Sequence, residues 1–467
     1  MSRAPETAGG SVRAGDARDA VNAALLARVL WRRARFRQRD GWSRAQLEAH
    51  QARSLARLRA FALDRSPFYR RFHRGLEAAP LAELPVLTKA ELMANFDDLV
   101  TDPRLKLRDL EAFLANPAGA GLYRGRYWVS ATSGSTGRPG IFVANGDEWA
   151  TVLASYARAF QLAGVQAGLT RRTTMAVVSS RVPWHQSSRV GSSLHSPFTP
   201  TLRLDATDPL ADNVARLNAF RPRVLVAYAS MASELATEQL AGRLDIAPEA
   251  VFSASEALTP AARRRIRDAW GNEPFNVYAA TETAGIASEC RKHAGLHLYE
   301  DLVIVEVVDA DNRAVPPGVT GAKLLVTVLF NRSQPLIRYE LSDTVRLAGR
   351  SCSTGGPYAL LEDVEGRSED VLSLPGPSGQ TVAVRPGVFH RALETQPVGE
   401  WQVIQEPGRL RVLVASPGST FLPGPLEAAL GAALREAGVV VPVIVQPVSE
   451  FPKTTLGKAP LVRADRA

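Results

Sequence analysis

The stretch Ser130-Ala-Thr-Ser-Gly-Ser-Thr-Gly-Arg-Pro-Gly140 is the strongest indication of what this chain folds into. It gathers five hydroxyl side chains and three glycines in one loop, and Arg138 adds a positive charge. Glycine lets a backbone approach an anion closely, and backbone N–H groups with Ser and Thr hydroxyls can surround phosphate oxygens. The apolar residues 141–143 follow directly, which favours an ordered phosphate loop over a flexible Ser/Gly linker. No Gly-Lys-Ser/Thr sequence closes the loop, so it is not a Walker A motif.

Strand and helix patterns alternate around this loop. We expect strands at 127–130, 174–179, 224–229, 250–253 and 275–278, with helices such as 213–220 and 260–270 between them. This alternation predicts an α/β fold with parallel sheets and helices packed outside. Apolar runs at 302–308 and 323–329 then predict a β-rich subdomain. Strands at 401–405, 410–414 and 440–445, with Leu426, Leu430 and Leu434 on one helix face, predict a small α/β unit at the C-terminus.

The N-terminal region reads as a loose tail followed by helices. Residues 1–20 are small and polar and predict the tail. Ser43 is a candidate N-cap of a helix that ends at Ser66-Pro67, and Thr88 is a candidate cap of a helix reaching Phe96. The arginines between residues 32 and 39 suit a membrane surface or a nucleic acid, but a solvated basic helix face is the favoured interpretation.

Composition narrows the class of protein. The 467 residues are 45% hydrophobic and 22% charged, which is ordinary for a globular protein of more than one domain. A net charge of +9 suits a nucleic-acid binder, but it equally suits an enzyme with an anionic substrate such as ATP. Two cysteines are too few for a disulfide framework and favour a cytoplasmic protein. No signal peptide is evident, and no run approaches the roughly 20 apolar residues of a membrane helix.

Eight further segments, in order, give the chain a family resemblance. With the loop at 130–140 they resemble the adenylate-forming superfamily, which contains acyl-CoA synthetases, adenylation domains and luciferases. The phenylacetate–CoA ligase branch, which includes coenzyme F390 synthetase, is the most similar. The segments are Ser66–Arg70, Leu84–Lys89, Ser253–Glu256, Tyr278–Glu282, 289–301 with Glu289-Cys290, Gly295-Leu-His297 and Glu300-Asp301, Ile337–Asp343, Gly366–Asp370 and Pro452–Lys458.

The resemblance implies a nucleotide site. It implies that the loop binds phosphates, that Ser255 and Glu256 lie along the adenine, and that Tyr278 stacks on it. It also implies that Thr281 contacts the α-phosphate, Glu282 holds Mg²⁺, and Asp343 accepts from the ribose hydroxyls near Arg367. A hard cation prefers oxygen ligands, so a carboxylate suits Mg²⁺. The loop residues concerned are Thr132, Ser133, Gly134, Ser135, Thr136, Gly137 and Arg138.

The resemblance also implies a moving small domain. Residues 21–367 are expected to form the large domain, with 300–367 as its β-rich subdomain. Residues 368–467 are expected to form the small mobile domain, with Glu369 and Asp370 at the hinge. Lys458 is expected to bridge the attacking carboxylate and the α-phosphate, stabilising charge as the transition state forms. Each of these residues has an ordinary structural alternative, such as a surface lysine or a turn aspartate.

Two further groups of residues have open interpretations. Trp184 and His185 follow a predicted strand and are candidates for the wall of the acceptor pocket, or for an ordinary surface loop. Cys290, His293, His297 and Cys352 raise the question of a structural zinc, which takes four N or S ligands and which some relatives carry in this region. Ordinary buried residues are the favoured interpretation of this group.

Three functions remain open from the sequence. The favoured one is an AMP-forming ligase that activates an aryl or related carboxylic acid and passes it to CoA. The second is an adenylating enzyme like F390 synthetase that uses another oxyanion, or one that hands its product to an amine or a carrier protein. The third is a nucleotide-binding pseudo-enzyme or a basic nucleic-acid binder. Glu282, Asp343 and Lys458 argue against a pseudo-enzyme, and we find no nucleic-acid module. Ala279, Ser255 and Gly140 depart from the usual motifs, and no CoA signature is evident.

Overall fold

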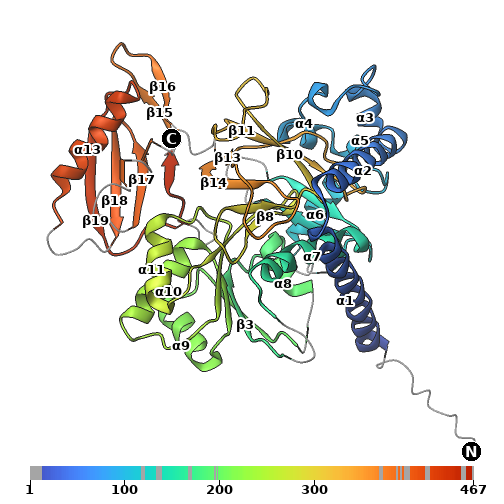
Figure 1. The fold of residues 1–467 in the computed structure, drawn as a ribbon, viewed down its shortest axis with the longest axis horizontal. Helices are drawn as coiled ribbons and strands as arrows, with labels where there is room; N and C mark the ends of the chain where they lie inside the picture. Colours follow the sequence, from blue (N-terminus) through green and yellow to red (C-terminus); the bar gives the residue numbers. More distant parts are fainter. Residues whose placement is uncertain are drawn as a thin grey trace, which may run out of the picture.

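A computed structural model describes most of the chain and begins with a long helix (Figure 1). The described residues are 13–116, 121–132, 139–166, 171–193, 196, 198–367, 372–384, 388–389, 392–393, 400–415, 421–453 and 459–464. Helix α1 spans Arg13–Asp40, so it starts within the segment expected to be a tail. Its N-terminal end projects away from the body (Figure 1). From Leu25 onward the helix packs into the main core, through Leu25, Val29 and Phe36.

Short helices follow, and their caps explain where they begin. Ser43 accepts a hydrogen bond from the backbone of Gln46 and caps α2, as the sequence predicts, and Ser66 both ends α2 and caps α3. Asn95 interrupts the helix predicted to reach Phe96, so two helices form where one was expected. The bounds are α2 Arg44–Arg65, α3 Pro67–Phe72, a 3-10 turn at Leu81–Glu83, α4 Lys89–Ala94, α5 Phe96–Leu99 and α6 Leu107–Ala115.

A nine-stranded mixed sheet forms the centre, in the order β13-β14-β9-β8-β7-β6-β5-β3-β4. Strands β3 to β7 run parallel, as the strand–helix alternation predicts, and β8 turns back antiparallel to β7. The elements are β3 Met175–Ser179, α8 Gln186–Ser193, β4 Thr201–Asp205, α9 Leu210–Phe220, β5 Val224–Ala227, α10 Ala229–Leu240, β6 Ala250–Ala254, α11 Pro260–Trp270, β7 Phe275–Ala280, β8 Ala284–Glu289 and β9 Leu296–Leu298. Buried side chains of α9, α10 and β3 to β6 form one core on this sheet.

Two smaller sheets complete the large part of the molecule. Strands β1 (Trp128–Ala131) and β2 (Ile141–Ala144) pair antiparallel and lead into α7 (Gly146–Leu162). Strands β10 (Val303–Val308), β11 (Lys323–Val328) and β12 (Tyr339–Leu341) form the expected β-rich region. Strands β13 (Asp343–Leu347) and β14 (Leu360–Arg367) join the edge of the central sheet.

Buried ion pairs connect the C-terminal end of α1 to these sheets. The Arg158 guanidinium on α7 is fully buried and donates to Asp40 of α1, to Asp301 and to the hydroxyl of Tyr358. Because both Arg158 and Asp301 are without exposure, neither charge is stable there alone.

The C-terminal residues form a unit with its own core. Strands β17 (Glu400–Glu406), β18 (Arg409–Ala415), β19 (Val443–Val448) and β20 (Val462–Ala464) make a four-stranded sheet, beside the hairpin β15 (Leu372–Pro375) and β16 (Thr381–Val384). Helix α13 (Pro423–Glu436) buries Leu426, Leu430 and Leu434, as predicted. The strand predicted at 440–445 begins only at Val443, because the preceding Pro442 has no N–H for a ladder. This unit lies beside α10 and α11, opposite α1 (Figure 1).

No helix within the described part of the chain is long and apolar enough to cross a membrane.

Candidate functional site

The carboxyl ends of β6 and β7 bring two of the predicted motifs together. These strands are parallel neighbours, with Ala254 opposite Val277 in register. The segment Ser253–Glu256 leaves the end of β6, and Tyr278–Glu282 runs from β7 into the following turn. Ser255 has a φ of 69°, a left-handed conformation that is uncommon for serine and that turns the chain sharply before Glu256. Ligands of α/β sheets bind at this edge, outside the carboxyl ends of the strands.

Tyr278 and Asp343 meet at this edge although 65 residues separate them. The Tyr278 hydroxyl donates a hydrogen bond of 2.8 Å to the Asp343 carboxylate, and the tyrosine is only 8% exposed. Asp343 begins β13, and the antiparallel register of β13 with β14 places Arg367 directly opposite it. One carboxylate, one buried tyrosine and one arginine position therefore lie together, with Asp343 oriented by its tyrosine.

Thr281 and Glu282 occupy the tight turn between β7 and β8. The backbone N–H of Thr283 donates to the carbonyl of Ala280 and closes the turn. Both predicted side chains are partly exposed. Glu282 acts electrostatically on Tyr156, whose pKa is raised to about 12, mainly by burial and further by the negative charge of Glu282. The Tyr156 hydroxyl accepts a hydrogen bond of 3.1 Å from the amide of Gln186.

The base of the phosphate loop is closed by a pair of residues. The Thr132 N–H donates to the Gly140 carbonyl, and the Gly140 N–H donates to the Thr132 hydroxyl at 2.8 Å. A Cβ added to Gly140 would come within 2.9 Å of the Phe142 ring, so a larger residue there would require this ring to shift. The predicted phosphate-binding residues Ser133, Gly134, Ser135, Thr136, Gly137 and Arg138 lie outside the described residues.

The candidate pocket wall, Trp184 and His185, is connected by a hydrogen bond to the strand that leads into this predicted loop. The Trp184 carbonyl accepts from the N–H of Ala131, the residue before Thr132. The His185 ring lies 3.1 Å through Nδ1 from the Ser180 hydroxyl. The Ser180 N–H in turn donates to the hydroxyl of Tyr228, the residue before α10. Trp184 and His185 thus belong to a segment that is hydrogen-bonded to Ala131 of β1 and, through Ser180, to Tyr228 before α10.

The C-terminal unit reaches the same edge of the sheet. Lys458, Glu369 and Asp370 lie outside the described residues, but Ala459, next to Lys458, is buried. The Ala459 N–H donates to the Glu256 carboxylate at 3.0 Å. The residue directly after the predicted Pro452–Lys458 segment therefore contacts the predicted Ser253–Glu256 segment.

Comparison with other proteins agrees with this arrangement. No family model matches the chain. The sequence is 26% identical over 356 residues to a phenylacetate–coenzyme A ligase of Thermus thermophilus, covering 71% of this chain and 73% of that protein. The structure matches a crystal structure of 2-hydroxyisobutyryl-CoA ligase in the postadenylation state with 2-HIB-AMP. There the TM-score is 0.70, with 19% identity over 92% of each chain.

The chain has the adenylate-forming ligase fold. The expected α/β architecture and the family resemblance are both confirmed. The same 2-hydroxyisobutyryl-CoA ligase, in complex with 2-HIB-AMP and CoA in the thioesterification state, gives a TM-score of 0.57 at 20% identity over 92% of each chain.

A buried sulfur–nitrogen cluster is formed by Cys290, which follows β8, by His297 on β9 and by Cys352 between β13 and β14. Candidate ligand atoms of Cys290, His297 and Cys352 all lie within 4.8 Å of one another. His297 Nε2 is buried without a hydrogen-bond partner among the described residues. Burial opposes ionisation of Cys352, yet hydrogen bonding to Thr354 holds the pKa of its thiol below the ordinary value. These three side chains offer three of the four ligands of a structural zinc.

His293, the fourth residue considered for zinc, is not part of this cluster and contacts Glu289 and Phe275 instead. Its Nδ1 lies 3.3 Å from Glu289, and its ring packs on Phe275.

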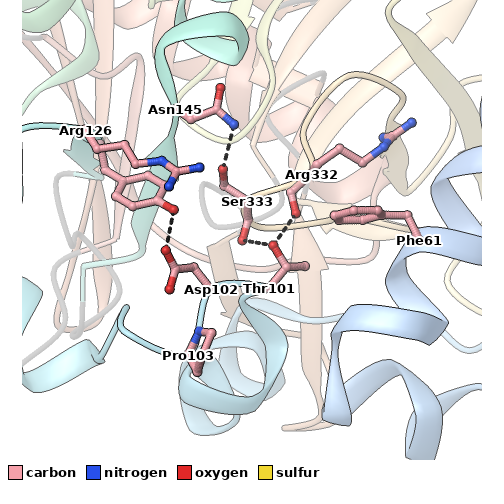
Figure 2. Close-up of a pocket in the computed structure, with 9 residues that line it drawn as sticks. Phe61, Thr101, Asp102, Pro103, Arg126, Asn145, Arg332 and Ser333 are labelled. Atoms are coloured by element: carbon pink, nitrogen blue, oxygen red, sulfur yellow. Dashed lines mark hydrogen bonds between the residues drawn. The ribbon is translucent and has the colours of Figure 1, made fainter.

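A surface cavity of about 270 Å³ lies away from the predicted site (Figure 2). Figure 2 shows Arg126 and Asn145 beside it. Arg126 precedes β1 and Asn145 follows β2, whereas the predicted phosphate-binding residues lie between these two strands in the sequence. Among the described residues, none of the predicted site residues lines this cavity. Its lining residues are Phe61, Thr101, Asp102, Pro103, Arg126, Tyr127, Asn145, Arg332 and Ser333.

Three residues near the site were not predicted for it. Tyr156 and Gln186 lie close to Glu282, and no local pattern singles them out. Lys89 was predicted as the last residue of the Leu84–Lys89 segment and as the start of a helix, with no role at the nucleotide. Its Cε lies 3.3 Å from the point that a Cβ on Gly140 would occupy. Gly140 stands where many phosphate loops of the superfamily that the chain resembles end in a lysine, and this departure could have prompted a search for another cation.

Proposed function

We propose that this protein is an ATP-dependent, AMP-forming ligase that activates a carboxylic acid as an acyl-adenylate. The pairing of Tyr278 with Asp343, beside the Thr281–Glu282 turn, is the observation that carries the proposal. In this proposal Asp343 would accept hydrogen bonds from the ribose hydroxyls, and Glu282, four residues after Tyr278, would hold a hard cation. The similarity to the Thermus thermophilus protein supports the same chemistry.

ATP and Mg²⁺ fit the residues at this edge. Asp343 would hold the ribose, with Arg367 opposite, and Ser255 and Glu256 would lie along the adenine beside Tyr278. Glu282 would hold Mg²⁺, which neutralises phosphate charge, and Thr281 would contact the α-phosphate. The oxygen donors of Glu282 and Asp343 match what a hard cation and a ribose need.

The loop at 133–138 and the two lysines would complete the phosphate site. We propose that Lys89, whose end lies against Gly140, supplies a positive charge at the exit of the phosphate loop. Lys458 would place its ammonium between the acid and the α-phosphate, where charge develops in the transition state. Glu369 and Asp370 would form the hinge between residues 21–367 and 368–467, and a domain movement there would separate the two half-reactions.

CoA is the proposed acceptor, and an aryl or related acid is the proposed substrate. The names of the relatives support this choice, since one is a phenylacetate–coenzyme A ligase and another is crystallised with 2-HIB-AMP and CoA. Trp184 and His185, with Tyr156 and Gln186, would line the acid site. A carrier protein, an amine or an F390 synthetase-like oxyanion is the alternative acceptor. We propose a cytoplasmic enzyme, which the two buried, unbridged cysteines support.

The test is pyrophosphate release from Mg-ATP with a panel of aryl, fatty and amino acids, with and without CoA. We expect acid-dependent release that Lys458→Ala lowers at least ~10²-fold, the scale for losing one charge-stabilising group. Lys292→Ala is the matched control, because it removes an exposed lysine from the turn after β8, and it should keep full activity.

Each outcome of this test separates the candidates. Turnover that needs CoA supports a CoA ligase. Release that stops near one equivalent and ignores CoA indicates another acceptor. ATP binding without release from any acid refutes carboxylate activation.

A further inference from the structure

The described residues on either side of 454–458, the segment that contains Lys458, are held together inside the small unit. Gln402, on β17, is 1% exposed and donates through one amide nitrogen to the carbonyls of Pro452 and Pro460, at 3.2 and 2.8 Å. One buried amide therefore joins Pro452 and Pro460, on either side of this segment, to the four-stranded sheet. The position of these two flanking residues is therefore set by how this sheet is placed against the large part of the molecule.

Two carboxylates of the large part contact the residues on either side of 454–458. Lys453 Nζ lies 2.7 Å from Glu234 on α10, and both side chains are about three-quarters buried. At the other end, the Ala459 N–H donates to Glu256 Oε1 at 3.0 Å. The second oxygen of Glu256 accepts from the Ser230 N–H at 2.9 Å, so the first turn of α10 fixes this carboxylate.

We propose that Glu234 and Glu256 are positioning residues that clasp the segment that contains Lys458 in the orientation needed for acid activation. This proposal rests on the proposed function, in which Lys458 acts in the first half-reaction. Glu256 is predicted from the motif to lie along the adenine. In this proposal it has a second role, because it also links the 253–256 segment to the segment that contains Lys458. A nucleotide that orders the 253–256 loop would also order the clasp, which couples ATP binding to the placement of Lys458.

The two contacts of the clasp, Lys453–Glu234 and Ala459–Glu256, can dissociate. An ion pair that is partly exposed contributes little net stability, and water can replace each partner. Glu256 keeps its Ser230 hydrogen bond when Ala459 leaves, so this carboxylate does not lose all its partners. The better superposition on the postadenylation state than on the thioesterification state of 2-hydroxyisobutyryl-CoA ligase, 0.70 against 0.57, supports the assignment of the clasped arrangement to the first half-reaction.

Charge reversal tests the clasp without depending on any substrate. Both native cysteines are buried, so spin labels on Asp268→Cys of α11 and Glu436→Cys of α13, both exposed, report the distance between the two parts. In ligand-free full-length protein we expect one dominant distance. Glu234→Lys should broaden or lengthen it, and the double variant Glu234→Lys/Lys453→Glu should restore it. Glu238→Lys is the matched control, since Glu238 on the same helix pairs with Arg243 inside the large part.

The catalytic readout uses phenylacetate as the first acid. Glu234→Lys should slow pyrophosphate release about 5-fold, the upper range for a partly exposed pair. Glu256→Gln should slow it about 10-fold, because one of its two N–H partners then faces an amide NH₂. Thioester formation from supplied phenylacetyl-adenylate and CoA should change less than about 2-fold in both. Restoration in the charge-swapped double variant separates positioning from a general loss of structure.

The outcomes distinguish this proposal from the proposed function. Identical distance distributions in the wild-type protein and Glu234→Lys overturn the clasp. Equal losses in both half-reactions also overturn it, because a merely structural defect lowers both. A distance shift that the double variant reverses, in a protein that releases no pyrophosphate with any acid, supports the clasp and overturns the proposed function.

Discussion

Replacing Tyr278 with phenylalanine is the most direct test of the nucleotide site, because it removes a single hydrogen bond. The Tyr278 hydroxyl donates to the Asp343 carboxylate at 2.8 Å, and the ring is almost fully buried. A hydrogen bond to a charged group contributes about 1.5–3 kcal/mol. If the lower value is the cost of letting Asp343 turn away from the ribose, ATP affinity falls about tenfold, since ~1.4 kcal/mol is a factor of ten.

The expected kinetic signature is a raised KM for ATP with little change in kcat. Ribose contacts are made equally in the ground state and the transition state, so their loss weakens binding without slowing chemistry. Calorimetric titration with ATP and pyrophosphate-release kinetics measure the two effects. Tyr69→Phe is the matched control. Its hydroxyl also donates within the large part, to Pro335 at 2.9 Å, so it should lower thermal stability and leave ATP affinity alone. An ATP affinity within twofold of wild type in Tyr278→Phe would refute the role assigned to this pair.

Three further changes have defined outcomes. Glu282→Gln should lower pyrophosphate release about 10²-fold and raise the Mg²⁺ concentration needed for half-maximal rate, and an unchanged Mg²⁺ dependence would exclude Glu282 as its ligand. Burial lowers the pKa of His73 to about 4, so the unfolded chain binds a proton more readily and stability is lost as pH falls from about 6.5 towards 4. His73→Leu should flatten denaturation midpoints measured across that window, and an equally steep dependence would assign it to other groups. Protein purified without chelators should contain about one zinc per chain if Cys290, His297 and Cys352 bind it, and Cys352→Ser should lose that zinc; equal metal content in both proteins would contradict the site.

The sequence predicts elements well where their boundaries are set by local chemistry. Ser43 marks the start of α2 because its hydroxyl caps the helix, and Pro260–Trp270 is found as predicted between Thr259 and Gly271. Predicted boundaries are wrong where the end of an element depends on contacts with residues far away in the sequence. The strand expected at 224–229 ends at Ala227, because Tyr228 already caps α10 and its hydroxyl is fixed by Ser180.

The same contrast between local and tertiary signals holds for the residues of the candidate site. Motif residues that follow strands, such as Glu256 and Glu282, lie at the expected edge because parallel strands carry their ends to one side. The partners of these residues could not be predicted. Tyr156 comes from the middle of α7 and Gln186 from the start of α8, and only the packing of the sheet brings them to Glu282.

The buried Arg158 has a consequence for the order in which the chain becomes structured during synthesis. Its carboxylate partner Asp301 lies 143 residues downstream, and Tyr358 lies 200 residues downstream. While the ribosome has released only the first half of the chain, Asp40 is the one of these three partners that has been made. Burying the guanidinium before Asp301 emerges would leave a charge poorly compensated, at a cost of several kcal/mol. Helices α1 and α7 therefore dock fully only after the β-rich region has been made, and a nascent chain exposes this surface to chaperones until then.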